Sequence, residues 1–310
     1  MMSSSQSQDL LKDQSAHTIV AGDLEAVFLP GHGMLGASLR HRNLEILRRI
    51  ENLPAAAAKG STAGIPLLHP WANRLAGSQY RAAGREVNLD PSSRLLHLDE
   101  HGLPMHGVPW SLLSWKVTEA KEDAVAAQLD WTSSDLLAIF PFRHRLEIAA
   151  TMRADGLALE TTLLASADGP VPVSFGFHPY FGVPELPRAQ WRLELPAMRR
   201  LVLDARGIPT GEEEAFEGFD GQLGESNFDD CFALFKSTSL SLAGAGRRIT
   251  VEFLEGYRYA QVFAPRGKDY VALEPMTAPT SALTSGRGLH LVEPGGEFRS
   301  AFRIRVDPLV

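Results

Sequence analysis

Four short segments of the sequence combine histidine, arginine, carboxylate and aromatic side chains with glycine and proline. The first, residues 64–75, places Trp71 next but one to Asn73 and Arg74. A tryptophan packs against the apolar face of a sugar ring, while amide and guanidinium groups hydrogen-bond to its hydroxyls. The segment therefore suits a carbohydrate, although taken alone it is more often a surface loop with a packed tryptophan.

Two further segments each hold a histidine beside aromatic residues. His106 lies in the segment 105–110, and His178 lies in the segment 174–181. A lone histidine among apolar residues is more often structural than functional. Its near-neutral pKa nevertheless makes it the natural proton donor for chemistry at pH 7. Residue type alone does not decide whether either histidine is structural or functional.

The fourth segment supplies a carboxylate at the end of an apolar run. Glu274 follows the run 270–273. Burying a carboxylate costs free energy unless it is paired or takes part in chemistry, so its position indicates a functional site. Upstream, Asp229 and Asp230 lie in the aromatic-flanked segment 227–232, and one of them is a candidate for binding hydroxyls.

Strict alternation of apolar and polar residues dominates the remaining sequence. It predicts strands over the ranges 125–131, 144–148, 157–163, 249–253, 257–263 and 298–306. Asp155-Gly156 between two of these runs predicts a hairpin turn, because both residues tolerate positive φ. The pattern is typical of an all-β protein, built as a large antiparallel β-sandwich of two sheets.

Helical segments are expected to be few and short. A turn or two is predicted after Pro54 at residues 55–59, and an acidic helical turn at residues 212–216. Residues 1–15 are predicted to form a flexible N-terminal arm, and residues 16–310 a single sandwich domain, because no linker-like tract or internal repeat divides them.

Composition and charge exclude several classes of protein. With 310 residues, 44% of them apolar, the chain has ample material for a globular core, and a net charge of -7 without basic runs argues against nucleic-acid binding. The single cysteine, Cys231, excludes an intrachain disulfide framework and fits the cytoplasm. The first residues lack the apolar region of a secretory signal, and no apolar stretch reaches the roughly 18 residues of a membrane helix, so no membrane partner is expected.

The order of the motifs resembles that of the aldose 1-epimerase (galactose mutarotase) family over nearly the whole chain. The matching motifs are Asn73-Arg74, His106-Gly107, His178 with Tyr180-Phe181, Asp229, and Leu273-Glu274-Pro275. In that family such motifs follow one another in this order on a large β-sandwich, the supersandwich. Each motif alone is weak, but their order together is specific.

The resemblance implies a function and a set of roles. It implies that the protein interconverts the α and β anomers of a hexose such as galactose or glucose, with His178 as general acid and Glu274 as general base. It further implies that Arg74, His106 and Asp229 hold sugar hydroxyls. Asn73 and Tyr180, which belong to the same motifs, complete the expected sugar-binding residues. Proton transfer suffices for this reaction, so neither a cofactor nor a metal is expected, and the expected partner is a monosaccharide bound by a monomer or homodimer.

Several departures from the family pattern fall around the expected substrate. The residues after His178 include Pro179 and Gly182, Val108 replaces the second glycine of a His-Gly-Gly motif, and Met276 replaces a frequent glutamine. The resemblance therefore supports the reaction type more than the choice of sugar. Asp229 is preferred to Asp230 because its spacing to the following aromatic and aliphatic residues matches the family pattern.

Other classes of function remain open from sequence alone. The close spacing of His97, His101 and His106 with Glu100 suggests a metal enzyme, although the spacing is not a recognised zinc motif. A sugar-binding protein on the same fold, or an epimerase for hexose 6-phosphates, would share most of the motifs. A glycosidase with two carboxylates ranks below these, because the sequence does not supply their separation.

Overall fold

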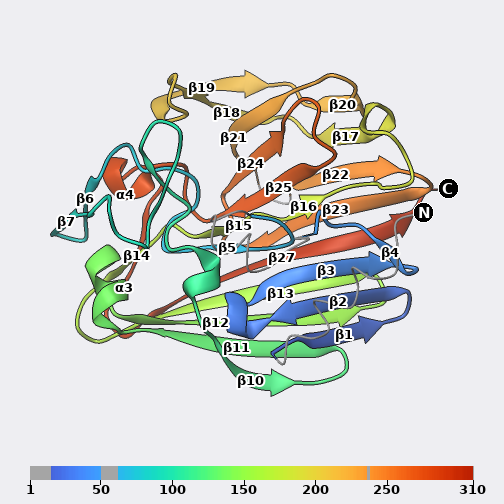
Figure 1. The fold of residues 1–310 in the computed structure, drawn as a ribbon. Coiled ribbons are helices and arrows are strands. Elements are labelled where there is room, and N and C mark those ends of the chain that lie inside the picture. The colour runs from blue at the N-terminus through green and yellow to red at the C-terminus, as the bar shows by residue number, and fades with distance from the viewer. Residues whose placement is uncertain (1–14, 50–61, 236–237, 310) are drawn as a thin grey trace.

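Two large antiparallel sheets dominate the computed structural model, which describes residues 15–49, 62–235 and 238–309 (Figure 1). The larger sheet has nine strands, in spatial order β10 (Lys116–Ala120), β11 (Ala124–Trp131), β12 (His144–Arg153), β13 (Gly156–Ala165), β27 (Glu297–Pro308), β23 (Arg247–Glu255), β22 (Ser239–Gly244), β17 (Arg192–Leu195) and β20 (Phe219–Gln222). All-β architecture is thereby confirmed, including the strands predicted at 125–131, 144–148, 157–163, 249–253 and 298–306.

The second sheet carries the residues that the sequence singled out. Its order is β19 (Pro209–Phe216), β18 (Met198–Leu203), β21 (Phe228–Ala233), β24 (Tyr259–Ala264), β25 (Val271–Met276), β15 (Gly176–Phe177) and β5 (Leu67–Leu68), with β16 (Tyr180–Phe181) also pairing with β25. The run predicted at 257–263 becomes a strand only from Tyr259, and β25 continues past Glu274, so this carboxylate lies within the strand and not at its end.

Smaller elements complete the structure. A four-stranded sheet contains β1 (His17–Ala21), β2 (Leu24–Leu29), β3 (Leu35–His41) and β4 (Leu44–Glu45), and two-stranded pairs join β6 (Gln79–Ala82) to β7 (Arg85–Asn88), β8 (His97–Leu98) to β9 (Pro104–Met105), and β14 (Val171–Val173) to β26 (His290–Val292). Helices in the described ranges are α3 (Ser134–Ile139), α4 (Ala282–Ser285) and the 3-10 turns η1 (Pro30–His32), η2 (Trp110–Leu112) and η3 (Arg188–Gln190).

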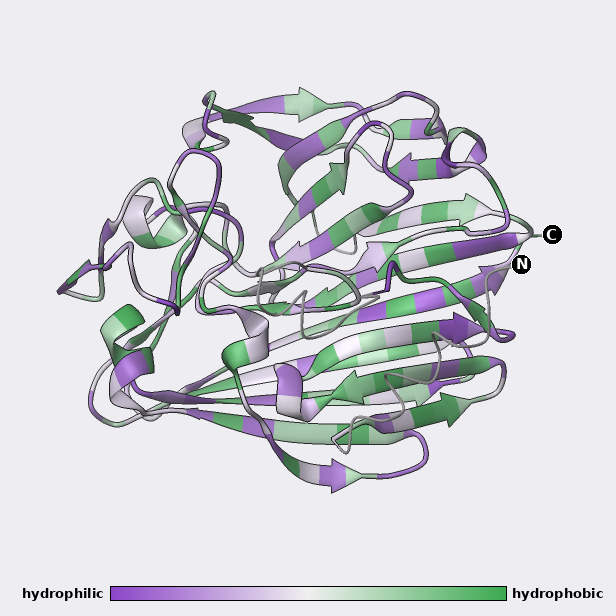
Figure 2. Cartoon of the chain, viewed as in Figure 1, coloured by the Kyte–Doolittle hydropathy of each residue, from purple (hydrophilic) through white to green (hydrophobic). Residues whose placement is uncertain are grey.

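The two large sheets pack over a shared apolar core. Phe177 of β15 lies 5.2 Å from Phe302 of β27, measured between ring centroids, and both side chains are buried. Alternation along the strands sends Leu273 into this core and the next residue, Glu274, to the opposite face of the smaller sheet. Figure 2 shows the same alternation as bands of polar and apolar residues along the strands.

The predicted acidic helical turn at 212–216 is wrong, because these residues form part of β19. A run of glutamates favours a helix, but strand pairing with β18 overrides this preference. Arg200 lies directly opposite Glu214, with Nε to Oε1 at 2.7 Å, and Arg199 contacts Glu213 at 3.4 Å. These cross-strand ion pairs explain why the acidic residues are stable in a strand.

The hairpin between β12 and β13 is confirmed, but its predicted backbone geometry is not. Arg153 pairs with Gly156, so the turn consists of Ala154 and Asp155, and neither Asp155 nor Gly156 has positive φ. A Cβ atom at Gly156 would lie 2.5 Å from the carbonyl oxygen of Ile304 on β27. Glycine is required here because the neighbouring strand approaches closely.

Two expectations fall on residues that the structure does not describe. The helical turn at 55–59 lies within residues 50–61, and nearly all of the expected arm lies within residues 1–14. The arm and the single domain at 16–310 stay predictions.

Candidate active site

His178 and Glu274 contact each other on the face of the smaller sheet that points away from the shared core. The distance from His178 Nε2 to Glu274 Oε1 is 3.2 Å, and the two residues are 4% and 1% exposed. His178 lies between β15 and β16, and its backbone N–H donates to the carbonyl oxygen of Pro66 at 3.0 Å. A histidine and a glutamate that are 96 residues apart in the chain thus meet in a buried pair.

Tyr180 packs flat against the His178 ring. The ring centroids are 4.0 Å apart with an interplanar angle of 8°, and Tyr180 Oη lies 3.0 Å from His178 Nε2. Because the rings are parallel, this oxygen lies over the imidazole face, away from the in-plane direction in which Nε2 forms its strongest hydrogen bond. The stack fixes the rotamer of His178 and leaves that direction to other partners.

Burial shifts the pKa values of His178 and Glu274 in opposite directions. Removal from water raises the pKa of Glu274 well above its usual value, and the carboxylate of Asp229 raises it further while Arg74 opposes the shift. Removal from water also lowers the pKa of His178 well below its usual value, helped by His106 and Arg48. In the dry site the pair therefore favours its uncharged form, with one proton on the carboxyl group.

His106 lies edge-on to His178. The ring centroids are 5.5 Å apart with an interplanar angle of 76°, and burial, assisted by Arg74 and His97, lowers the pKa of His106 to about 3. His106 is consequently a neutral hydrogen-bonding group at physiological pH. Its own φ is +62°, and its N–H donates to the carbonyl oxygen of Asn73, which also has positive φ.

Arg74 is held from behind by a buried carboxylate. Its Nε donates to Asp99 Oδ2 at 2.6 Å, and the Asp99 side chain is 1% exposed. Arg74 Nη1 donates to Asn73 Oδ1 at 3.2 Å. Asp99 is fixed in turn by the backbone N–H groups of His101 and Leu103, each at 2.9 Å. The clamp orients the guanidinium close enough to Glu274 to affect its pKa.

Asp229 and Asp230 point to opposite faces of the sheet. Asp229 accepts a hydrogen bond from Gln261 Nε2 at 2.6 Å, and Gln261 lies directly opposite Glu274 in the strand register. Asp230 instead contacts Arg200 at 3.5 Å. Desolvation raises the pKa of Asp229 although its side chain still reaches solvent. Asp229 is therefore the aspartate on the face of the candidate pair.

Several buried polar atoms around the pair have no hydrogen-bond partner among the described residues. They are Gln261 Oε1, Glu274 Oε2, His178 Nδ1 and His106 Nδ1. Leaving a buried polar group unpaired costs roughly 1–3 kcal/mol, so four in one cluster indicate a site prepared for a polar ligand.

The remaining histidines of the motifs lie outside the His178–Glu274 pair, although His97 comes close enough to His106 to lower its pKa. His69 is buried against His144, with 3.0 Å between their Nε2 atoms. His97 is the first residue of β8, and His101 lies in the turn that follows Asp99. Within the described ranges, no group of three or more His, Cys, Asp or Glu side chains is arranged to hold a metal ion. The proposed cluster of His97, Glu100, His101 and His106 is thus not assembled as a metal site.

Three further contributors to the site were not identified from sequence. Asp99 and Gln261 orient Arg74 and Asp229, while Arg48 lies over the ring of Tyr270, 4.7 Å from its centroid, and 5.7 Å from that of Tyr180. Of these three residues, only Gln261 could have been found from the sequence, because it is a polar residue within an otherwise apolar strand segment.

A family model for aldose 1-epimerase matches residues 23–305. The chain belongs to the aldose 1-epimerase family. Among curated relatives, the uncharacterized protein YihR of Escherichia coli K12 is 24% identical, covering 93% of this chain and 92% of its own. Maltose epimerase of Levilactobacillus brevis is 26% identical over 63% of this chain and 59% of its own.

Solved structures agree on the fold. A galactose mutarotase-like protein from Clostridium acetobutylicum superposes with a TM-score of 0.83 at 20% identity, covering 94% of this chain and 95% of the other. At this identity the likeness shows that the fold is the galactose mutarotase-like sandwich, as the sequence predicted. Among the described residues, no helix has the length and apolar character needed to cross a membrane.

Proposed function

We propose that the protein is an aldose 1-epimerase, which interconverts the α and β anomers of a hexose such as galactose or glucose by ring opening and reclosure. The observation that carries this proposal is the buried contact between His178 and Glu274 at 3.2 Å. Anomer exchange requires one proton to leave O1 and another to reach the ring oxygen. Both oxygens are bonded to C1, so two neighbouring proton-carrying side chains match their geometry.

In the proposed reaction, Glu274 accepts the proton of the O1 hydroxyl and His178 gives a proton to the ring oxygen. The C1–O5 bond breaks and leaves a free aldehyde. Rotation about C1–C2 presents the other face of the carbonyl, and reclosure with the two roles reversed gives the other anomer. The isomerisation involves no net oxidation or reduction, so proton transfer alone balances it.

The opposite pKa shifts of His178 and Glu274 agree with this scheme, because the pair holds the same number of protons in its uncharged form and in its ionised form. The uncharged pair and the ion pair of imidazolium and carboxylate both hold one proton. The two forms therefore differ only in which of the two groups, with Nε2 and Oε1 3.2 Å apart, carries that proton. Sugar hydroxyls donating to the carboxylate, together with the nearby Arg74, favour the ionised form that the first step needs.

The remaining expected residues are proposed to hold the sugar. Arg74, oriented by its clamp, donates to hydroxyls; neutral His106 and Asn73 offer hydrogen bonds beside it; and Asp229 accepts from hydroxyls at the more open side of the site. Tyr180 keeps the His178 ring in place through its stack. The match to a relative named maltose epimerase supports an epimerase reaction.

Polarimetry of the purified protein tests this proposal. We expect mutarotation of α-glucose or α-galactose at a rate well above the spontaneous one, with glucose 6-phosphate as a third substrate that tests the phosphorylated alternative. A protein that binds these sugars but leaves the spontaneous rate unchanged would be a binding protein, and the proposal would be wrong.

A further inference from the structure

Two short loops share one design, although they lie in different parts of the chain. Residues 99–103 read Asp-Glu-His-Gly-Leu between β8 and β9, and residues 204–208 read Asp-Ala-Arg-Gly-Ile between β18 and β19. In each loop the carbonyl oxygen of the aspartate accepts the N–H of the glycine, at 3.0 Å in the first and 2.9 Å in the second. Both glycines have a left-handed backbone, with φ of +71° and +75°. The chain therefore builds the same turn twice.

The aspartate of each loop closes its own turn with one carboxylate oxygen. Oδ1 of Asp99 accepts from the backbone N–H groups two and four residues later, each at 2.9 Å. Oδ1 of Asp204 accepts from the corresponding groups at 2.8 and 3.0 Å. An aspartate commonly closes a turn in this way. The loops differ in what Oδ2 holds, which is Arg74 Nε at 2.6 Å in the first loop and the second loop's own Arg206 Nη2 at 3.1 Å.

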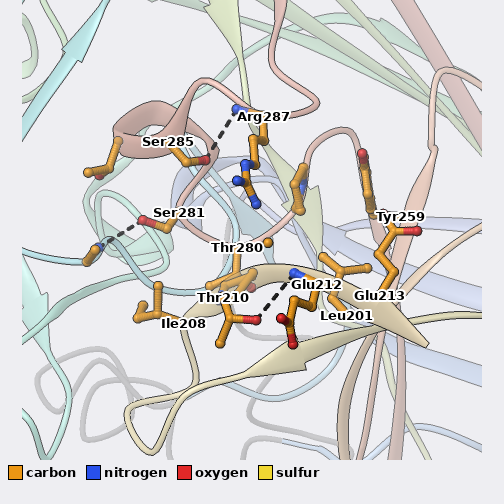
Figure 3. A pocket seen from close by; sticks show the side chains of 15 residues that line it. Leu201, Ile208, Thr210, Glu212, Glu213, Tyr259, Thr280, Ser281, Ser285 and Arg287 are labelled. Carbon is orange, nitrogen blue, oxygen red and sulfur yellow. Dashed lines mark hydrogen bonds between the residues drawn. The ribbon is translucent and has the colours of Figure 1, made fainter.

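The second loop also touches Arg74, but through its glycine. A Cβ atom at Gly207 would lie 3.2 Å from Arg74 Nη1 and 3.6 Å from its Cζ. Ile208, the last residue of this loop, lines a pocket together with Ala76, which follows Arg74 by two residues (Figure 3). At the matching position of the first loop, a Cβ atom on Gly102 would meet nothing within 4 Å. Arg74 is thus contacted by the aspartate of one loop and by the glycine of the other.

These contacts leave one edge of the Arg74 guanidinium for a ligand. Nε donates to Asp99, and Nη1 donates to Asn73 Oδ1 at 3.2 Å beside Gly207. Among the described residues, Nη2 has no acceptor at hydrogen-bond distance, because the Glu100 carboxylate is 3.9 Å away. The Arg74 side chain is 12% exposed. A guanidinium held along one side in this way presents its remaining donors in a fixed direction.

Fixing an arginine in the folded protein affects how tightly it binds a ligand. A free arginine side chain samples many rotamers, and a ligand that captures it must restrict them at a cost in free energy. When the fold has already restricted the side chain, that cost does not weaken sugar binding. The two loops are placed to provide this restriction, one by charge and one by shape.

We propose that the loops 99–103 and 204–208 together position Arg74 for sugar binding. Asp99 holds the guanidinium by its carboxylate, and Gly207 leaves the space in which the guanidinium lies, so that Nη2 is directed to a sugar hydroxyl. Asp99 and Gly207 are positioning residues, since they act on the substrate through Arg74. The inference rests on the proposed function and adds two residues to the sugar-binding part of that site.

The two loops supply matched controls for each other. Asp99→Asn and Gly207→Ala change a contact with Arg74, whereas Asp204→Asn and Gly102→Ala make the same chemical changes where Arg74 is not touched. We expect the first two variants to raise KM about 10-fold with kcat changed less than about 3-fold, because the sugar contact exists in both ground and transition states. The two controls should keep the wild-type KM. Polarimetry measures both constants.

Thermal unfolding separates backbone strain from the contact with Arg74. Both glycines have positive φ, so Gly102→Ala and Gly207→Ala should lower the unfolding temperature by similar amounts. Only Gly207→Ala should also raise KM. An equal rise of KM in both alanine variants would assign the effect to strain and overturn the positioning role of Gly207.

The same substitutions in an Arg74→Ala background show whether they act through Arg74. Once the guanidinium is absent, Asp99→Asn and Gly207→Ala should have no further effect on the KM or on the calorimetric affinity for the sugar. Loops that only support the fold would weaken binding by the same factor in both backgrounds. That result would overturn the proposal.

An NMR measurement tests the loops without requiring turnover. The Nε–H signal of Arg74, assigned in arginine-labelled protein by its absence from Arg74→Lys, should exchange slowly with water because its hydrogen bond is charge-assisted. It should be lost or exchange rapidly in Asp99→Asn, shift in Gly207→Ala and stay unchanged in both controls. Absence of turnover with every sugar contradicts the proposed function, and this pattern of signals would still support the loops. A signal that responds to neither Asp99→Asn nor Gly207→Ala overturns the inference while leaving the proposed function intact.

Discussion

At the scale of single residues, the site depends on two groups whose ionisation is coupled by contact. His178 and Glu274 have little access to water. Their pKa values move in opposite directions because burial disfavours the charged form of each residue. Groups this close titrate as a pair, so the number of protons on the pair matters more than their distribution. The pair can both accept and donate a proton when it holds one proton.

The pH dependence of kcat/KM should report this pair. Because the pKa of His178 is lowered, a second proton binds only well below pH 6.5, and the acidic limb should lie there. Because the pKa of Glu274 is raised, the single proton is retained well above pH 4.5 and is lost only on the alkaline limb. A profile that already falls on acidification through pH 6.5 would contradict the protonation scheme.

The two neighbouring aspartates offer a matched comparison. Asp229→Ala should raise KM about 10-fold and also lower kcat, because the contact is present in both ground and transition states. Asp230→Ala should change KM little, since Asp230 faces the other side of the sheet and pairs with Arg200. Kinetics on both variants distinguish the two. A large effect of Asp230→Ala with a silent Asp229→Ala would place the sugar contact one residue later.

At the scale of elements, pairing between strands decides features that local sequence does not. The glutamates of β19 suit a helix, yet cross-strand arginines hold them in a strand. Gly156 was expected to serve a turn, yet its backbone is ordinary and its role is to admit the carbonyl oxygen of Ile304. Both cases depend on a partner distant in sequence.

This role of Gly156 predicts the effect of a methyl group. Gly156→Ala should destabilise the protein by about 1–3 kcal/mol, the typical cost of overpacking, because β27 must move. Gly169→Ala is the control, since a Cβ atom there meets nothing within 4 Å. Urea unfolding of the two variants measures the difference. Equal stabilities would show that the β13–β27 contact is not tight at this position.

At the scale of the whole molecule, buried histidines connect the two large sheets. His144, the first residue of β12, donates from Nδ1 to the carbonyl oxygen of Phe142 at 2.6 Å, which leaves its Nε2 to accept from Nε2 of His69, next to β5. Burial lowers the pKa of His144 to about 4 and lowers that of His69 as well. The connection therefore requires neutral imidazoles.

This bridge predicts how stability changes with acid. A histidine whose folded pKa is lowered stabilises the fold fully above pH 6.5, its unfolded value, and loses that contribution as the pH falls toward 4. The stability difference between the wild type and His144→Gln should therefore shrink by roughly 3 kcal/mol between pH 7 and pH 4. Denaturant unfolding at a series of pH values measures it, with His290→Gln as an exposed control. If the stability difference between the wild type and His144→Gln is the same at every pH, protonation of His144 is not linked to unfolding.

Much of the fold could be predicted from sequence because alternation repeats along each strand. The candidate site could be predicted only as a set of motifs. His178, Glu274, Arg74, His106 and Asp229 were identified by type and order, and the structure brings their segments together. Asp99 and Arg48 could not be found this way, because their contacts with Arg74 and Tyr270 form between segments whose approach only the folded chain defines.

The most direct test of the proposed mechanism is the anomerisation rate of Glu274→Gln and His178→Asn, measured by polarimetry with sugar binding measured in parallel. Each substitution keeps a polar side chain in place and removes one proton-transfer group. We expect kcat to fall at least ~10² in each variant with binding largely retained. His106 replacement should act mainly on KM. Near-normal turnover in either of the two variants would contradict the claim that this pair exchanges the proton of the sugar.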